Sequence, residues 1–246
     1  MIRSTRAAGR LLRCLLHILH GLGVIWLRFP GIDVPARRVF IQWWASKTLR
    51  LLGIELRLEG TPAEGGALLV ANHVSWLDIM AVHAVCPRAR FVSKAVVKSW
   101  PLVSGLADAA GTLYLERERK RDALRVVHTV AQALQAGDLV AVFPEGTTSD
   151  GHVLLPFHGN LLQAAIATAT PVQALALRFS DSSATVSRAV EYVGDTSLVE
   201  SLWRIASGHG IVVRIALLPP RASADWERRE LAQVLREDIE GALGRF

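Results

Sequence analysis

The chain has 246 residues, of which 51% are hydrophobic, so it can bury a sizeable core in one large domain with an appendage. Its formal charge of +6 favours an anionic partner: an anionic membrane surface, a phosphorylated substrate or nucleic acid. Its two cysteines, Cys14 and Cys86, are too few for a disulfide framework or a cysteine-based metal site, which excludes both classes.

Residues 1–50 predict a membrane-association segment of two basic amphipathic helices. Six basic or histidine side chains recur there at steps of three or four residues, namely Arg3, Arg6, Arg10, Arg13, His17 and His20. That spacing keeps them on one face of a helix, and leucines fill the other faces. We expect this helix to lie in the headgroup region of a bilayer, with the basic face toward lipid phosphates.

After the breaker Phe29-Pro30-Gly31, a second helical stretch carries Arg37, Arg38 and Lys47 beside Trp43 and Trp44. Tryptophan and basic residues together are typical of the membrane–water boundary, so we expect a helical hairpin on the cytoplasmic face of a membrane. Peripheral attachment is the first interpretation and a single spanning N-terminal helix is the second. An ordinary basic helix packed on the domain is the third.

From residue 51 onward, short apolar runs alternate with helical patterns. Strands are predicted at 67–71, 90–92, 112–115, 139–143, 172–177, 189–193 and 211–218. Helical spacing of Leu124, Val127, Ala131 and Leu134 predicts a helix before Gly137, and Ser223 is the expected cap of a final helix. The predicted fold is α/β, with a mixed central sheet flanked by helices over residues 51–246.

The first strand runs directly into Asn72-His73-Val74-Ser75-Trp76-Leu77-Asp78. Strand ends that lead into helices are where α/β proteins build their sites, and a histidine with a carboxylate partner is a common general base. The same segment also fits a helix-capping pattern with a structural histidine. If the pair is functional, His73 lies in the loop before the helix and Asp78 in its first turn, because five positions on one helix point to different faces.

A second polar segment, Pro144-Glu145-Gly146-Thr147-Thr148, follows the apolar strand that ends at Phe143. The His-x4-Asp element together with Phe-Pro-Glu-Gly-Thr resembles the glycerolipid acyltransferases typified by 1-acylglycerol-3-phosphate acyltransferase. Residues 111–117, a glycine-led strand ending in Arg117, are similar to the family's second block, and Pro171 with its apolar strand resembles the fourth. The resemblance implies an enzyme of phospholipid biosynthesis. Independently of it, a mixed central sheet flanked by helices would bring the three strand ends to one edge, as a shared pocket requires.

The resemblance implies transfer of a fatty acyl group from a thioester, acyl-CoA or acyl carrier protein, to a lysolipid hydroxyl, with no metal or other cofactor. His73 is the expected base and Asp78 its orienting partner, as in a serine-protease triad. No Gly-x-Ser-x-Gly elbow occurs, so we expect direct transfer without an acyl-enzyme. Backbone N–H groups near Gly146 or the Ser75 helix start are candidates for the oxyanion site.

Seven residues are expected to bind substrate, namely Asn72, Lys94, Arg117, Glu145, Gly146, Thr147 and Thr148. Arg117, assisted by Lys94, would hold an anionic group, because a guanidinium matches phosphate or carboxylate oxygens. The alternative is that Arg117 belongs to a solvated charge run at a helix start. Glu145 and Gly146 would bind the hydroxyls of the acceptor, and their alternative is an ordinary turn after a strand.

Two positions depart from the family pattern. Phosphatidate-forming members usually have arginine where this chain has Thr148, and often lysine where it has His158. Losing two positive charges weakens the case for a phosphomonoester acceptor. We rank 1-acylglycerol-3-phosphate first because the other motifs match, and a lyso-ornithine lipid or a lysophospholipid diester stays open.

Other function classes fit less well. A lipid hydrolase lacks its nucleophile elbow and a clustered ligand set. A non-catalytic membrane-binding module would need the basic helices but not His73, Asp78 and Glu145 together. A nucleic-acid partner is not expected, because the basic residues of the first 50 positions lie beside leucine and tryptophan instead of on a reader fold.

Overall fold

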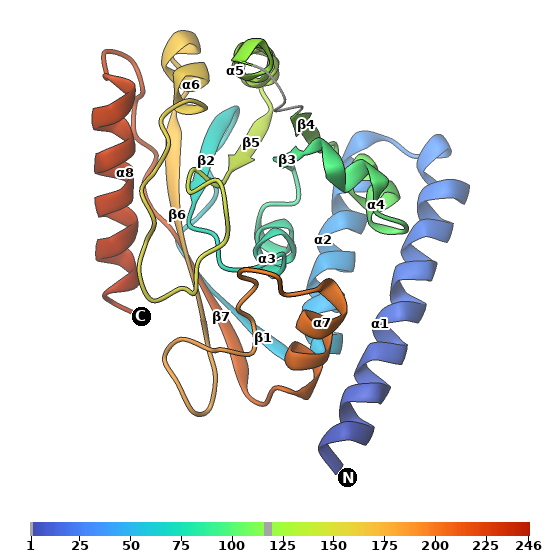
Figure 1. The fold of residues 1–246 in the computed structure, drawn as a ribbon. Coiled ribbons are helices and arrows are strands. Elements are labelled where there is room, and N and C mark those ends of the chain that lie inside the picture. The colour runs from blue at the N-terminus through green and yellow to red at the C-terminus, as the bar shows by residue number, and fades with distance from the viewer. Residues whose placement is uncertain (1, 116–119) are drawn as a thin grey trace.

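The computed structural model describes residues 2–115 and 120–246, which form a layered α/β fold around one mixed sheet (Figure 1). The seven strands are β1 (Ile54–Glu59), β2 (Ala67–Ala71), β3 (Ala89–Lys94), β4 (Leu113–Leu115), β5 (Leu139–Val142), β6 (Val172–Ser180) and β7 (Ile211–Leu217), in the spatial order β1-β7-β6-β2-β5-β3-β4. The predicted fold class, a mixed central sheet flanked by helices, is confirmed.

Strand direction places the polar motifs at one edge of the sheet. β2 is parallel to both β5 and β6, and β3 is parallel to β5 and to β4. Only β7, antiparallel to β6, and β1, its parallel neighbour, run the other way among the described strands. The carboxyl ends of β2, β5 and β4 therefore meet at the same edge, where open α/β sheets form their sites.

Helices cover both faces of the sheet. On one face lie α5 (Lys120–Gln135), α6 (Leu162–Thr168) and α8 (Arg228–Leu243), which bury Val130, Leu162 and Leu235 against it. On the other lie α2 (Val34–Leu52), α3 (Leu77–Val85) and α7 (Leu198–Ser207), with α1 (Ile2–Leu27) and α4 (Val103–Ala109) farther out. Every residue of β2 is buried, as expected for a parallel strand covered on both faces.

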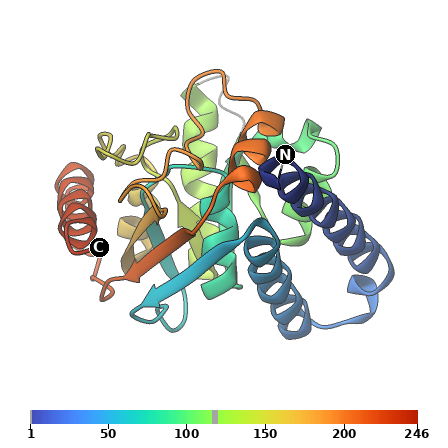
Figure 2. The same ribbon diagram turned by 90° about the horizontal axis from the view of Figure 1, so that it is seen from below.

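The predicted helical hairpin exists as α1 and α2, joined by the short 3-10 turn η1 (Phe29–Gly31). Seen from below, the hairpin and α8 lie at opposite ends of the molecule (Figure 2). His17 and Trp44 join the two helices: each accepts on its backbone carbonyl a bond with the other's ring nitrogen, at 3.1 and 3.2 Å. Gly21 permits this approach, since a Cβ there would lie 2.4 Å from Trp44 Nε1.

The orientation of α1 differs from the prediction for part of its basic stripe: Arg10 and His17 face the protein, whereas Arg13 and His20 are exposed. Arg10 donates to the carbonyls of Ala206 and Gly208 at the end of α7, at 3.0 and 2.9 Å, and His17 is buried. The apolar face points outward instead, with Leu12, Leu15, Leu16 and Leu19 each about half exposed. This inward part of the basic stripe was mistaken for the lipid side because spacing alone does not tell which face meets the protein.

Three further expectations are corrected. Residues 189–193 form turns and irregular backbone, in which Val190 is buried. Apolar residues buried in a loop produce the same apolar run in the sequence as a strand. Ser223 does not cap α8, whose N-cap is Glu227. The Ser223 hydroxyl donates instead to the Ala165 carbonyl. Strand β1 was missed because its exposed edge position lets charged residues alternate along it.

Candidate active site at the strand ends

The loop after β2 is held by the side chain of its first residue. Asn72 donates from Nδ2 to the Leu177 carbonyl at 2.9 Å and accepts from the Leu177 N–H at 2.8 Å. This amide fork joins the end of β2 to β6, and Asn72 is almost fully buried. Asn72 therefore fixes the point from which His73 projects, and its predicted contact with substrate stays a prediction.

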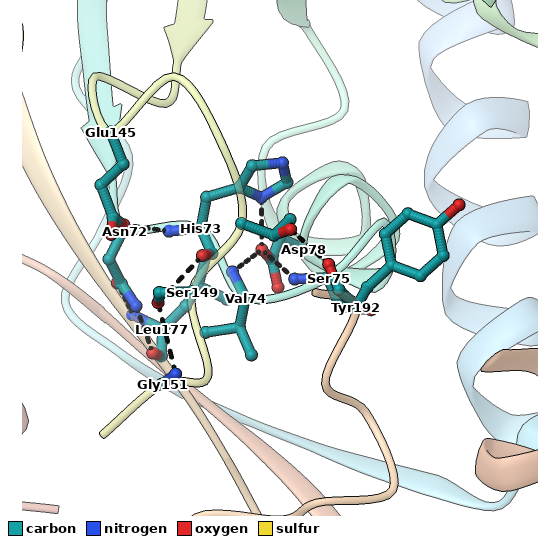
Figure 3. A network of polar contacts seen from close by, with 11 residues as sticks. Asn72, His73, Val74, Ser75, Asp78, Glu145, Ser149, Gly151, Leu177 and Tyr192 are labelled. Atoms are coloured by element: carbon teal, nitrogen blue, oxygen red, sulfur yellow. Dashed lines mark hydrogen bonds and ion pairs between the residues drawn. The ribbon is translucent and has the colours of Figure 1, made fainter. Parts of the chain in front are cut away.

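His73 and Asp78 form the predicted pair. His73 lies in the loop and Asp78 in the first turn of α3, and Nδ1 of His73 is 2.7 Å from Oδ2 of Asp78 (Figure 3). Because the carboxylate accepts from Nδ1–H, the neutral imidazole carries its lone pair on Nε2, which points away from Asp78. The His73 side chain is 18% exposed, so Nε2 can meet a substrate.

Asp78 is an anchor for the whole turn. Its Oδ2 also accepts from the N–H groups of Val74 and Ser75, at 2.7 and 2.9 Å, and the side chain is fully buried. These bonds are local, spanning three to five residues, which is why the His-x4-Asp spacing is sufficient to build them. The ring of His73 is further fixed by stacking on Phe143 at 3.9 Å and 9°.

Glu145 joins the second motif to the first. Its Oε1 accepts from the His73 N–H at 2.6 Å and its Oε2 from the Leu155 N–H at 3.0 Å. Burial raises the pKa of this carboxyl, and the two backbone donors oppose that rise. With both oxygens bonded and 4% of the residue exposed, Glu145 holds the two loops together, and its predicted contact with an acceptor hydroxyl stays a prediction.

Three N–H groups at the positions suggested for the oxyanion, those of Gly146, Val74 and Ser75, are already hydrogen-bonded within the protein. Gly146, at φ 72°, donates to the Phe143 carbonyl at 3.1 Å, and Val74 and Ser75 donate to Asp78. A left-handed backbone here favours glycine, which explains the Glu-Gly sequence as a tight turn.

Of the two threonines that follow, Thr147 is exposed and the Thr148 hydroxyl donates to the Tyr192 carbonyl. The Ser149 N–H donates to the His73 carbonyl at 2.8 Å, and the Tyr192 N–H to that of Val74 at 3.3 Å. Loop 181–197 therefore contacts both motif segments through the backbone of Tyr192, a contribution that sequence reasoning missed because it arises from long-range bonds.

The predicted anion-binding residues come from neighbouring strands. Lys94 is exposed at the end of β3, directly opposite Leu115 at the end of β4. Arg117 lies outside the described residues. Among the described residues, no group of three or more His, Cys, Asp or Glu side chains is arranged to hold a metal ion.

An apolar cavity of about 240 Å³ lies beside the site, between the hairpin, α3 and α4. Its lining includes Trp44, Trp76, Ile79, Met80, Phe91 and Trp100. Phe91 also stacks on Phe143 at 5.6 Å, so the cavity begins one ring beyond the aromatic partner of His73. The sequence signal for this cavity is the run of large apolar residues in α3, which by itself resembles an ordinary core stripe.

The chain is similar to known proteins both in sequence and in fold. Residues 54–178 match the model of the Acyltransferase family. The chain is 36% identical to the lyso-ornithine lipid O-acyltransferase of Pseudomonas aeruginosa, over 99% of this chain and 93% of that protein. It is also 36% identical to the 1-acyl-sn-glycerol-3-phosphate acyltransferase of Neisseria meningitidis, over 78% and 73% of the two chains. The crystal structure of PlsC from Thermotoga maritima has the same fold, with a TM-score of 0.71, 20% identity, and coverage of 96% and 97%.

Proposed function

Because the chain belongs to the PlsC-type acyltransferase family, we propose that it transfers a fatty acyl group from an acyl thioester to the free hydroxyl of a lysolipid, with His73 as the general base. The observation that carries the assignment of His73 is its 2.7 Å bond to the fully buried Asp78, which leaves Nε2 as the free acceptor.

In the proposed reaction, Nε2 of His73 takes the proton of the acceptor hydroxyl as its oxygen attacks the thioester carbonyl. The resulting imidazolium is stabilised by Asp78. When the tetrahedral intermediate collapses, the carbon–sulfur bond breaks and the proton passes to the leaving thiolate. Ser75 is the serine nearest to His73 in the sequence. It is fully buried and cannot reach a substrate, which supports direct transfer without an acyl-enzyme.

The apolar cavity supplies a place for the acyl chain of the donor. It opens beside Phe91, and its walls are formed by large apolar side chains, so a hydrocarbon chain there would leave water on entry. The donor head, coenzyme A or acyl carrier protein, would stay outside, near Lys94 at the strand edge.

The acceptor is proposed from the second motif. The Thr148 hydroxyl is used by the Tyr192 carbonyl, and His158 packs against Gly146, so neither supplies the permanent charge that a phosphomonoester favours. This favours a lyso-ornithine lipid, the acceptor named for the Pseudomonas relative that spans nearly the whole chain. Lysophosphatidate is the second candidate, supported by the equally identical Neisseria relative.

The outward face of α1 supports membrane association. One helix, within Ser4–Gly31, is long and apolar enough by length and composition to cross a membrane. Its exposed leucines and Trp26 would meet lipid, while its basic face holds the domain. We propose that the hairpin embeds in the cytoplasmic leaflet, where thioester donors are found, and brings the cavity to the lipid acceptor.

The test is a thiol-release assay with detergent-solubilised protein. Palmitoyl-CoA and palmitoyl-acyl carrier protein are each offered with lyso-ornithine lipid, lysophosphatidate or lysophosphatidylcholine, and the ester product is identified by mass spectrometry. We expect release that needs lyso-ornithine lipid and falls at least about a hundredfold in His73→Ala. His128→Ala, an exposed histidine on α5, is the matched control.

The outcomes separate the parts of the proposal. Release driven by lysophosphatidate alone would overturn the acceptor assignment but keep the chemistry. Equal rates in wild type and His73→Ala would overturn the general-base assignment.

A further inference from the structure

A histidine is among the few polar side chains that line the apolar cavity. His83 lies on α3 and lines the cavity together with Ile79 and Met80 of the same helix. It is 4% exposed, and its Nδ1 has no hydrogen-bond partner among the described residues. Buried polar atoms without a partner are uncommon in folded proteins, and the structure has others, such as Ser75 Oγ and Asp78 Oδ1; His83 differs from these in lining the cavity, where a bound ligand can pair with its imidazole.

His83 is an uncharged imidazole at neutral pH. Burial lowers its pKa to about 4, and no carboxylate is close enough among the described residues to form an ion pair with it. A neutral imidazole offers one N–H donor and one nitrogen acceptor. A hydroxyl group also offers one donor and acceptor lone pairs, so it is the simplest group that can pair with either tautomer.

The position of His83 relates it to the reacting groups. Its ring meets Phe91 edge-on at 5.1 Å, Phe91 stacks on Phe143 at 5.6 Å, and Phe143 stacks on His73 at 3.9 Å. An acyl chain whose carbonyl lies at His73 would pass Phe91 before it meets His83. His83 is therefore placed to contact the interior of the chain, several carbons from the thioester.

Two further hydroxyls line the same cavity. Ser93 lies two residues after Phe91 on the same face of β3, and Thr112 directly precedes β4. The side of the cavity next to the sheet therefore carries polar groups, whereas α1 and α2 contribute mainly apolar side chains to it. This asymmetry is not needed to hold an unsubstituted hydrocarbon chain.

We propose that the cavity selects an acyl donor whose chain carries a hydroxyl group, and that His83 is the specificity-determining residue that hydrogen-bonds to this hydroxyl. The inference rests on the proposed acyl transfer. An unsubstituted chain would leave the imidazole of His83 without a hydrogen-bond partner. A leucine or phenylalanine at position 83 would have no polar atom to leave unpaired.

The experiment compares palmitoyl-CoA with hydroxypalmitoyl-CoA isomers that carry the hydroxyl at successive interior carbons. For wild type we expect one isomer to exceed palmitoyl-CoA about tenfold or more in kcat/KM, because a site built for a hydroxyl discriminates against its absence. In His83→Leu that ratio falls to about one, because no nitrogen remains to bond the hydroxyl. Met80→Leu, a volume-conserving change in the same cavity wall, keeps the ratio.

A binding measurement tests the inference without catalysis. Hydroxypalmitate and palmitate compete with a fluorescent fatty acid for wild type, His83→Leu and Met80→Leu, and circular dichroism checks that each variant is folded. We expect hydroxypalmitate to displace the probe at lower concentration only where His83 is present.

Three results overturn the inference. Equal kcat/KM and equal displacement by both ligands would show that His83 needs no hydroxyl, for example because a buried water pairs with it; the proposed function would be unaffected. A preference that survives in His83→Leu would assign it to another residue. A preference seen only when the hydroxyl is on the acceptor chain would mean that the cavity holds the acceptor. If no thioester is consumed, the proposed function fails, and the competition result still decides the role of His83.

Discussion

In the loop after β2, buried polar groups of His73, Asp78 and Glu145 are bonded to backbone or side-chain partners within a few residues or across two loops. In the α1–α2 hairpin the arrangement is reversed. Arg10 and His17 face the protein, while leucines and Trp26, which is 78% exposed, face outward. One region buries polar groups that bond mainly to one another and to nearby backbone, with Asp78 Oδ1 and Ser75 Oγ left unpaired among the described residues, and the other leaves its apolar groups uncovered.

The difference indicates that the two regions have different surroundings, the protein interior for the loop after β2 and lipid for the outer face of α1. Polar groups buried in protein need hydrogen-bond partners, because an unpaired buried group is costly. An exposed apolar face is unfavourable in water but neutral in lipid, which has no hydrophobic penalty for leucine. The strand-end network therefore specifies chemistry within the domain, and the hairpin specifies where the domain resides.

The largest expected effect is on catalysis, through the hydrogen bond between His73 and Asp78. Asp78→Asn keeps the shape of the side chain but no longer fixes Nδ1 as the protonated nitrogen, so kcat falls by about a thousandfold or more. Thiol release with the best acceptor measures it. Asp195→Asn, an exposed residue beyond the site, is the control. A loss below about tenfold would mean that Asp78 is only a helix anchor.

The next effect is on the uncovered face of α1. Replacing Leu12, Leu15, Leu16 and Leu19 by serine removes four apolar contacts with lipid, each worth about 1.5 kcal/mol or more if fully buried. We expect vesicle partitioning to fall at least about a hundredfold in a flotation assay.

The matched control replaces three exposed apolar residues elsewhere, Leu58, Leu124 and Val153. Equal partitioning of the leucine variant and wild type would assign membrane contact to another surface. An equal loss in the control would mean that general surface polarity, and not the α1 face, governs partitioning.

The same contrast explains what the sequence could predict. His73 and Asp78 were predicted, together with their placement, because their bonds span five residues and depend only on a loop followed by a helix turn. The strands β2 and β5 were predicted because fully buried parallel strands give continuous apolar runs.

Long-range contacts set the limit. The roles of Asn72 and Glu145 depend on Leu177 and Leu155, and no local pattern announces a bond to a distant backbone group. The direction of the α1 basic face depends on α7, nearly 200 residues away, with Arg10 and Ala206 separated by 196 positions. His83 was not singled out from the sequence, because its missing partner is visible only when its surroundings are known.

A smaller effect concerns His83, whose buried Nδ1 has no hydrogen-bond partner among the described residues. The pKa of His83 is lowered from 6.5 to about 4, so the unfolded chain binds more protons than the native protein between these values. Stability therefore rises with pH across that window and is lost as pH falls through it, by up to about 3 kcal/mol at pH 4. His83→Phe should remove this part of the pH dependence in urea unfolding followed from pH 7 to pH 4. Parallel pH profiles of the two proteins would contradict the buried neutral state.

The smallest effect tests whether the hairpin is held by its basic face. Arg10→Met keeps the apolar stem but loses bonds to Ala206 and Gly208 near the end of α7, where a cation is also favoured by the helix dipole. We expect a loss of about 1–2 kcal/mol in urea unfolding in mild detergent. Arg13→Met is the control, because Arg13 is exposed and its guanidinium bonds only to Gly9 of its own helix, so its effect should stay within about 0.5 kcal/mol. Equal losses in both variants would mean that the two arginines act alike on the membrane side. A loss confined to Arg10 would separate the face that holds the domain from the face that meets lipid.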